Sequence, residues 1–339
     1  MRSLLKPAAG LVCLFALATA GCSTASDGTE SDSTESAETS DKAPATPVTS
    51  YAPYVSATDA SDLDSAGSPT TYNLAFVIST GSGCTPKWND SDPIGDSAVK
   101  SRIARLKEGG ATVRVSFGGA SGKELAATCD NAAELAKAYG TALDAAGSDQ
   151  ADFDIEGDEL TDSDSVDVRS EAIALLQKER TDLDVSFTLP VMPSGLDADG
   201  LALLESANNS AVQVSTVNLM TMNYGESYDG DMGDYAITSA NSAHDQLMDV
   251  FGTSDAAAWR GMALTSMIGV NDVEGETFTL SDAGQVRAFA AEKGVAWVSM
   301  WSTFRDQECV AGDADENDAL TNCSGVVQGA GAFGEAFAG

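Results

Sequence analysis

Three acidic residues in one short stretch are spaced as a carboxylate active site would require. Asp152, Asp154 and Glu156 alternate with Phe153 and Ile155. Alternate side chains of a β-strand face the same way, so the three acids would share one face, about 7 Å apart along the strand. Like charges in an apolar interior cannot all ionise, which raises the pKa of at least one carboxyl. A carboxyl that keeps its proton near neutral pH is what a general acid needs.

The composition of the chain allows a second interpretation of this pattern and excludes nucleic-acid binding. The chain has 52 acidic and 18 basic residues and a formal net charge of −34, so an acidic string could be a solvated edge of an acidic protein. The apolar residues between the acids argue against that alternative. The net charge repels phosphate backbones, so we expect no nucleic-acid partner.

A single histidine, His244, restricts the chemistry further. A Ser-His-Asp triad or a multi-histidine zinc site would depend on this one residue. It falls on a predicted surface helix, where we expect a solvated side chain. We therefore expect no metal and no cofactor.

Eight short apolar or β-branched runs alternate with helical stretches after residue 50. The expected strands are 51–57, 71–79, 112–118, 151–156, 184–190, 214–222, 262–267 and 295–301. The expected helices are 95–108, 123–146, 165–181, 197–208, 234–251, 281–293 and 325–337, with little helix signal in the first gap. This alternation predicts a parallel sheet, and eight repeats predict a closed (β/α)8 TIM barrel. A doubly wound open sheet is the alternative, weakened because no Gly-x-Gly-x-x-Gly follows the first strand.

In such a barrel the active site lies at the C-terminal ends of the strands, where further unusual residues occur. They form the segments Ser116-Phe117-Gly118-Gly119, Met220-Thr221-Met222-Asn223-Tyr224, Trp301-Ser302 and Arg305-Asp306. The stretch 149–156 resembles the Asp-x-x-Asp-x-Asp-x-Glu signature of glycoside hydrolase family 18, the chitinases and chitinase-like proteins. The other segments are similar to that family's third-, sixth- and eighth-strand motifs, in the family's order. The resemblance covers residues 51–310.

The resemblance implies hydrolysis of β-1,4-linked N-acetylglucosamine polymers with retention, in which the substrate's acetamido group is the nucleophile. Glu156 would be the general acid. Asp154 would hold the acetamido N–H, and Asp152 would lie deeper and share a proton with Asp154. Tyr224 would bind the acetamido oxygen, and Trp301 would form the floor under the sugar.

The sixth-strand segment supplies further substrate-binding candidates and also departs from the family pattern. Met220, Met222 and Asn223 are expected at the substrate. Many family members have Tyr where Met222 stands, and Asp is usual at the position of Asn223, so one negative charge near the site is missing. Gln150 stands where Gly is frequent. Ser116, Gly118 and Gly119 would allow close packing beneath the acids.

Two other functions fit the same residues. The first is a chitinase-like lectin that binds such glycans without hydrolysis, an option that Asn223 leaves open. The second is an endo-β-N-acetylglucosaminidase acting on protein N-glycans. Retention of Glu156 favours a hydrolase.

The N-terminus predicts export and a membrane anchor. Residues 1–21 combine early positive charge with a short apolar run and small residues before Cys22, which resembles a lipoprotein signal with Cys22 lipidated. An ordinary cleaved signal peptide is the alternative. Residues 22–49 are rich in Ser, Thr, Asp and Glu and predict a disordered tether, followed by the catalytic domain 50–339. We expect a monomer on the extracellular face of a bacterial membrane, or secreted, with an N-acetylglucosamine polysaccharide as partner.

Four cysteines remain after the signal region. An even number in an exported protein predicts disulfides, with three possible connectivities. We favour Cys84–Cys129 and Cys309–Cys323, because each pair lies in neighbouring stretches of chain and would staple long loops.

Overall fold

The computed structural model describes residues 48–79, 81, 83–310 and 318–339. The predicted signal peptide, the predicted lipidation of Cys22 and the predicted tether up to residue 47 lie outside the described residues. Thr49, next to the predicted start of the catalytic domain, is buried and donates its hydroxyl to the Ala290 carbonyl at 3.0 Å. Within the described ranges no helix is long and apolar enough to cross a bilayer.

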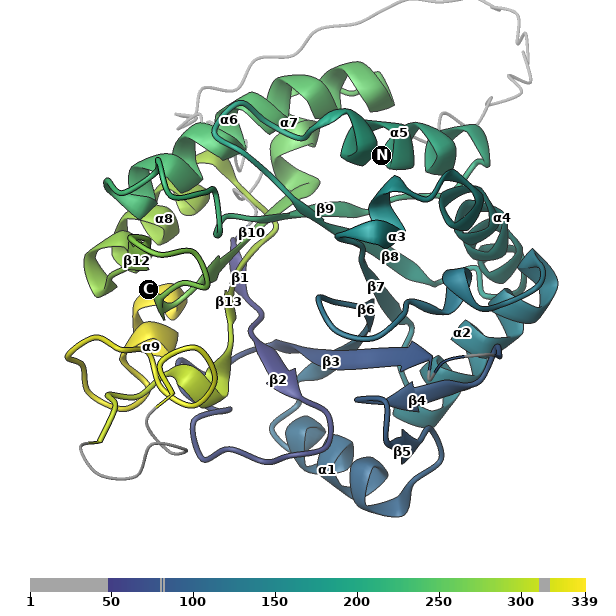
Figure 1. Cartoon of the computed structure of the whole chain (residues 1–339), viewed down its shortest axis with the longest axis horizontal. Helices are drawn as coiled ribbons and strands as arrows, with labels where there is room; N and C mark the ends of the chain where they lie inside the picture. The colour runs from purple at the N-terminus through teal and green to yellow at the C-terminus, as the bar shows by residue number, and fades with distance from the viewer. Residues whose placement is uncertain (1–47, 80, 82, 311–317) are drawn as a thin grey trace, which may run out of the picture. The chain divides into compact units, whose positions relative to one another are not determined.

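Parallel strands form a ring at the centre of the domain (Figure 1). They are β1 Ser50–Tyr51, β2 Tyr54–Ser56, β3 Thr71–Ser79, β6 Thr112–Gly118, β7 Gln150–Asp154, β8 Asp184–Pro190, β9 Thr216–Met220, β10 Met262–Met267 and β13 Trp297–Trp301. Each pairs with the next from β3 to β13. The segment containing β1 and β2 closes the ring, because β1 pairs with β13 and β2 pairs with β3. The predicted (β/α)8 barrel is confirmed.

The first strand, predicted as one element over 51–57, is interrupted at Pro53. Proline has no N–H to donate to a ladder, but its carbonyl accepts a hydrogen bond from the Asn73 N–H at 2.9 Å. The segment therefore changes partner at this point, with β13 before it and β3 after it. The short strands β4 Pro86–Trp88, β5 Asp92–Pro93, β11 Gly269–Val270 and β12 Thr277–Phe278 lie outside the ring.

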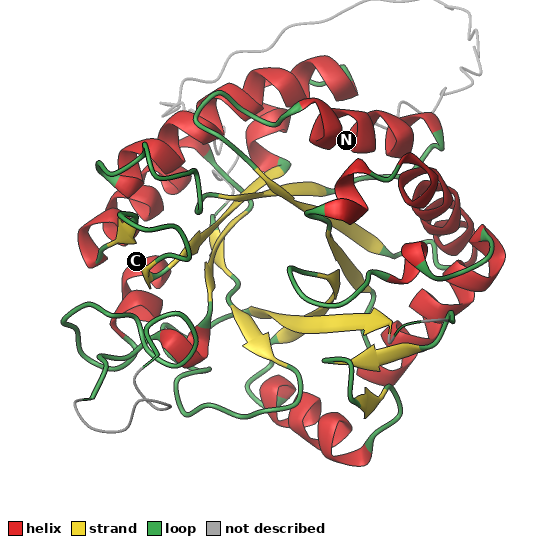
Figure 2. Ribbon diagram, viewed as in Figure 1, coloured by secondary structure: helices red, strands yellow, loops and turns green. Residues whose placement is uncertain are grey.

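Helices surround the ring (Figure 2). They are α1 Ser97–Lys107, α2 Ala132–Ala146, α3 Asp158–Thr161, α4 Ser163–Glu179, α5 Ala198–Asn209, α6 Met232–Phe251, α7 Asp255–Arg260, α8 Leu280–Lys293 and α9 Ala332–Ala338, with 3-10 turns at Leu125–Ala127 and Thr303–Arg305. Capping side chains determine where several helices begin. Asn131 accepts from two backbone N–H groups at the start of α2, and Thr279 forms a capping box with Asp282 on α8. As predicted, no helix separates β2 from β3.

The two faces of the strands separate apolar from polar side chains. Phe117, Phe153 and Phe187 are cross-strand partners on β6, β7 and β8, and their ring centroids lie 5.3 and 5.6 Å apart. They pack outward, with the Phe153 ring 5.0 Å from Tyr139 of α2. Their neighbours in sequence, including Asp152, face the interior of the ring. The predicted alternation therefore holds on β7.

The single histidine corrects one expectation. His244 on α6 is 5% exposed, and its ring stacks on Trp259 of α7 with the centroids 4.1 Å apart. Its Nε2 lies 3.2 Å from the Asp255 carbonyl oxygen. The prediction of a solvated side chain was wrong because α7 covers this part of α6.

Two disulfides cross-link long connections. Cys84 pairs with Cys129 across 45 residues and Cys309 with Cys323 across 14, as favoured from the sequence. The first joins the connection after β3 to the loop before α2.

Removing the disulfides should lower stability in proportion to loop entropy. Closing loops of these lengths stabilises the folded state by about 4 and about 3 kcal/mol in the chain-entropy treatment. We expect Cys84→Ala/Cys129→Ala to lower the free energy of unfolding in urea more than Cys309→Ala/Cys323→Ala does. The reverse order would show that native-state contacts, rather than chain entropy, set the contribution of each bond.

Candidate active site

The carboxylate of Asp152 lies inside the ring and is surrounded by hydroxyl groups. Its two oxygens accept hydrogen bonds from four side chains: Tyr54 at 2.9 Å, Ser116 at 2.7 Å, Ser186 at 2.7 Å and Thr188 at 2.9 Å. These residues come from three different strands, β2, β6 and β8. The ring therefore provides Asp152 with donors from three sides, and a carboxylate held in this way is a structural anchor for the layer above it.

Asp154 lies on the same face of β7, one layer closer to the open end. It is 6% exposed, and its Oδ1 has no hydrogen-bond partner among the described residues. Burial, and then the charges of Glu156 and Asp152, raise the pKa of Asp154 well above its usual value. In the part of the chain that the structure describes, no hydrogen bond joins Asp152 to Asp154. The expected sharing of a proton between them is therefore not supported by a direct contact.

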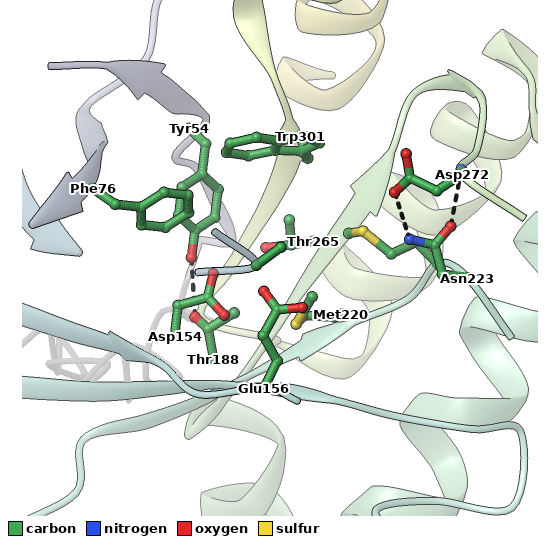
Figure 3. A pocket seen from close by; sticks show the side chains of 12 residues that line it. Tyr54, Phe76, Asp154, Glu156, Thr188, Met220, Asn223, Thr265, Asp272 and Trp301 are labelled. Atoms are coloured by element: carbon green, nitrogen blue, oxygen red, sulfur yellow. Dashed lines mark hydrogen bonds between the residues drawn. The ribbon is translucent and has the colours of Figure 1, made fainter. Parts of the chain in front are cut away.

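Glu156 follows the end of β7 and lines an open pocket at the C-terminal end of the ring (Figure 3). Burial, followed by the charges of Asp272 and Glu159, raises the pKa of Glu156 to about 7. A carboxyl whose pKa is raised in this way keeps its proton closer to neutral pH, which suits proton donation. Asp154 and Glu156 thus both enter the pocket, as the spacing predicted.

Aromatic side chains form the opposite wall. Trp301, at the end of β13, lies in the pocket with Tyr54 and Phe76. The Trp301 ring centroid is 5.9 Å from that of Tyr54 and 5.5 Å from that of Phe76. The position of Trp301 agrees with a sugar floor. Tyr54 and Phe76 were missed from the sequence, although both are aromatic residues on the first two strands of the barrel.

The segment after β9 brings only part of the predicted substrate-binding residues to the pocket. Met220, Met222 and Asn223 line the pocket, but Tyr224 does not. Asn223 has φ 55°, a left-handed conformation that interrupts the strand alternation. Tyr224 is consequently buried against α6, where its hydroxyl accepts a hydrogen bond from Ser239 at 3.3 Å. The predicted contact of Tyr224 with an acetamido oxygen stays a prediction, and in this structure the Tyr224 hydroxyl is directed to α6 instead of the pocket.

Two glycines permit close packing at the carboxylates. Gly118 has φ 100°, and a Cβ there would lie 2.1 Å from the Asp154 carbonyl oxygen. At Gly119, with φ 88°, a Cβ would lie 2.8 Å from the Phe76 ring. The Gly119 N–H also donates to the Asp154 carbonyl at 2.9 Å. Any side chain at either position would displace the end of β7 or the aromatic wall.

The pocket continues on both sides as a groove. A neighbouring cavity shares Ala120 and Glu156 with the central pocket, and another shares Phe76 and Trp301. Glu156 therefore lies within a groove that extends in two directions. Among the described residues, no group of three His, Cys, Asp or Glu side chains is arranged to hold a metal.

Comparison with known proteins agrees with this geometry. No protein-family model matches the chain. It is 35% identical over 281 residues to a probable bifunctional chitinase/lysozyme of Escherichia coli (strain K12) and 34% identical over 280 residues to endochitinase 11 of Metarhizium anisopliae, in each case over 77% of this chain. The matches span 31% and 53% of those two proteins.

A solved structure extends the similarity to three dimensions. The catalytic domain of a hyperthermophilic chitinase from Pyrococcus furiosus superposes with a TM-score of 0.75 at 29% identity, over 86% of this chain and 94% of that one. The described part of the chain is therefore a barrel domain of chitinase-like sequence and fold.

Proposed function

We propose that the chain is a glycosidase of the family 18 type that hydrolyses β-1,4-linked N-acetylglucosamine polymers such as chitin. The observation that carries the proposal is the convergence of Asp154, Glu156 and Trp301 in one open pocket at the C-terminal end of the barrel. The names of the similar proteins support the same substrate class.

In this proposal Glu156 begins the reaction. Its carboxyl donates a proton to the glycosidic oxygen as the bond to C1 breaks. The carbonyl oxygen of the substrate's own acetamido group attacks C1 and forms an oxazolinium ion, so the sugar keeps its configuration after water has added. The Glu156 carboxylate then removes a proton from that water, which restores the acid form.

Asp154 and Trp301 act on the same sugar. Asp154 is buried beside the reacting centre, and once it has lost its proton its charge stabilises the oxazolinium cation. Trp301 offers an aromatic face on which the apolar face of the sugar stacks. Asp152 supports Asp154 from below through its four hydroxyl donors.

The groove favours cleavage within a chain. Because the neighbouring cavities share Glu156 on one side and Trp301 on the other, sugar units can extend from the cleavage point in both directions. An exo-acting enzyme would need one end of the groove closed. We therefore propose endo action on a polymer.

Product analysis tests the substrate and the mode together. Early in the hydrolysis of chitohexaose, we expect internal cleavage that yields dimers, trimers and tetramers rather than one end product. An N-glycoprotein incubated in parallel should release no glycan. Glycan release without cleavage of chitohexaose would favour the endo-β-N-acetylglucosaminidase alternative, and binding of chitohexaose without turnover would favour the lectin.

A further inference from the structure

The loop between β11 and β12 brings a carboxylate to the pocket that the sequence motifs did not reveal. Asp272 lines the pocket together with Glu156 and Asn223 (Figure 3). It belongs to none of the strand-end segments that suggested the active site. The mechanism proposed above gives it no role.

Hydrogen bonds fasten this loop to the segment after β9. The Asn223 Nδ2 donates to the Asp272 Oδ2 at 2.9 Å, and the Asp272 backbone N–H donates to the Asn223 Oδ1 at 3.1 Å. A third bond runs from the Gly225 N–H to the Glu276 Oε1 at 2.8 Å. A backbone N–H can only donate and a carboxylate can only accept, so the orientation of the Asn223 amide is fixed.

The same pairing explains why an amide suits position 223. A carboxylate there would place two acceptors against each other, since the atom facing the Asp272 Oδ2 must be a donor. Asn223 and Asp272 therefore carry one negative charge between them. That charge lies on the β11–β12 loop, within the pocket that holds Glu156.

Other charged groups near Glu156 act on it together with the charge of Asp272. Asp154 on β7 and Glu159 in α3 interact electrostatically with Glu156, and Asp158, Asp162 and Lys123 line the cavity that adjoins it. Arg305 also interacts electrostatically with Asp272, but its guanidinium is buried and donates to the carbonyls of Trp301, Val270 and Ala319. Among the described residues Asp272 forms no ion pair, so Arg305 offsets its charge without a direct contact between the two groups.

We propose that Asp272, held by Asn223, is a positioning residue whose negative charge keeps Glu156 protonated toward neutral pH. This inference rests on the proposed role of Glu156 as the general acid. The raised pKa of Glu156 agrees with this role, because burial is its largest cause and the charge of Asp272 is the next. Both Asn223 and Asp272 are exposed, so solvent screens the interaction between Asp272 and Glu156, and its effect is smaller than that of a buried charge.

Asp272→Asn isolates the charge. The new amide can still accept from Asn223, so the loop stays fastened while the charge is lost. We expect the alkaline limb of kcat/KM on chitotetraose, measured at low ionic strength, to move to lower pH by on the order of half a pH unit. Activity on that limb would then fall about threefold. Glu274→Gln removes a charge from an exposed position of the same loop outside the pocket and should leave the limb in place.

Exchanging the two side chains supplies the decisive variant. Asn223→Asp/Asp272→Asn restores the side-chain pairing and returns one negative charge to the pair, so the limb should return toward the wild-type pH. An unmoved limb in Asp272→Asn, or an equal shift in Glu274→Gln, would overturn the inference. Failure of the proposed function would be recognised separately, because the wild type would then not hydrolyse chitotetraose, or Glu156→Gln would retain the wild-type activity and limb.

Discussion

Glu156→Gln is expected to lower kcat/KM on chitotetraose by about 10²–10⁴, the usual contribution of a positioned general acid. The amide has almost the shape of the carboxyl but has no proton that it can transfer to the leaving oxygen. Circular dichroism and the melting temperature should stay near the wild-type values, because the Glu156 side chain is only partly buried and lines an open pocket. Glu171→Gln, at an exposed position of α4, is the matched control and should retain full activity.

A substrate with a better leaving group distinguishes the loss of the general acid from a loss of substrate binding. A dinitrophenolate leaves without protonation, so a dinitrophenyl β-chitobioside needs much less help from Glu156 in the bond-breaking step. The variant should therefore lose much less activity on this substrate than on chitotetraose. Its alkaline limb near pH 7 should also disappear, because the group that titrates there is gone. Equal losses on both substrates would instead assign Glu156 to binding.

Regular alternation made the barrel predictable from the sequence. The ranges expected for β3, β6, β8 and β10 agree with the observed strands residue for residue. Each of these strands is a short β-branched or apolar run whose ends are marked by polar or turn residues, so local preference and burial point to one answer. The helix expected over 123–146 was wrong at its start, because Asn131 caps α2 and the preceding residues form a short 3-10 turn.

The active site was predictable only where it lies on the strands. Asp152, Asp154 and Trp301 face the interior because strand periodicity fixes their direction. Tyr224 lies beyond the end of β9, and the left-handed Asn223 reverses its direction. Asp272 comes from a loop, whose path depends on hydrogen bonds to a segment 49 residues away in sequence. No periodic pattern encodes such a contact.

Asp154→Asn is expected to make the protein more stable and much less active. Asp154 is buried, its Oδ1 has no partner among the described residues, and its pKa in the folded state is raised. A raised pKa means that the folded state binds the proton more tightly than the unfolded state does. The wild type therefore loses stability as the pH rises from about 3.9, the unfolded value, through the folded pKa. The amide does not titrate, so the variant should keep its stability across this range, and urea unfolding at pH 4 and pH 7 measures the difference.

The loss of activity follows from the same burial. The amide of the Asp154→Asn variant would imitate the neutral carboxyl of the resting protein, but it could never supply the negative charge that stabilises the oxazolinium ion. Removing one preorganised electrostatic partner of a transition state typically lowers kcat by about 10²–10³, with little change in KM. A variant that keeps its kcat would show that neutral Asp154 is sufficient and that the charge of the ion is balanced elsewhere. Gain of stability with loss of kcat would instead show that the ring holds this carboxyl at a cost in folding energy because the reaction needs its charge.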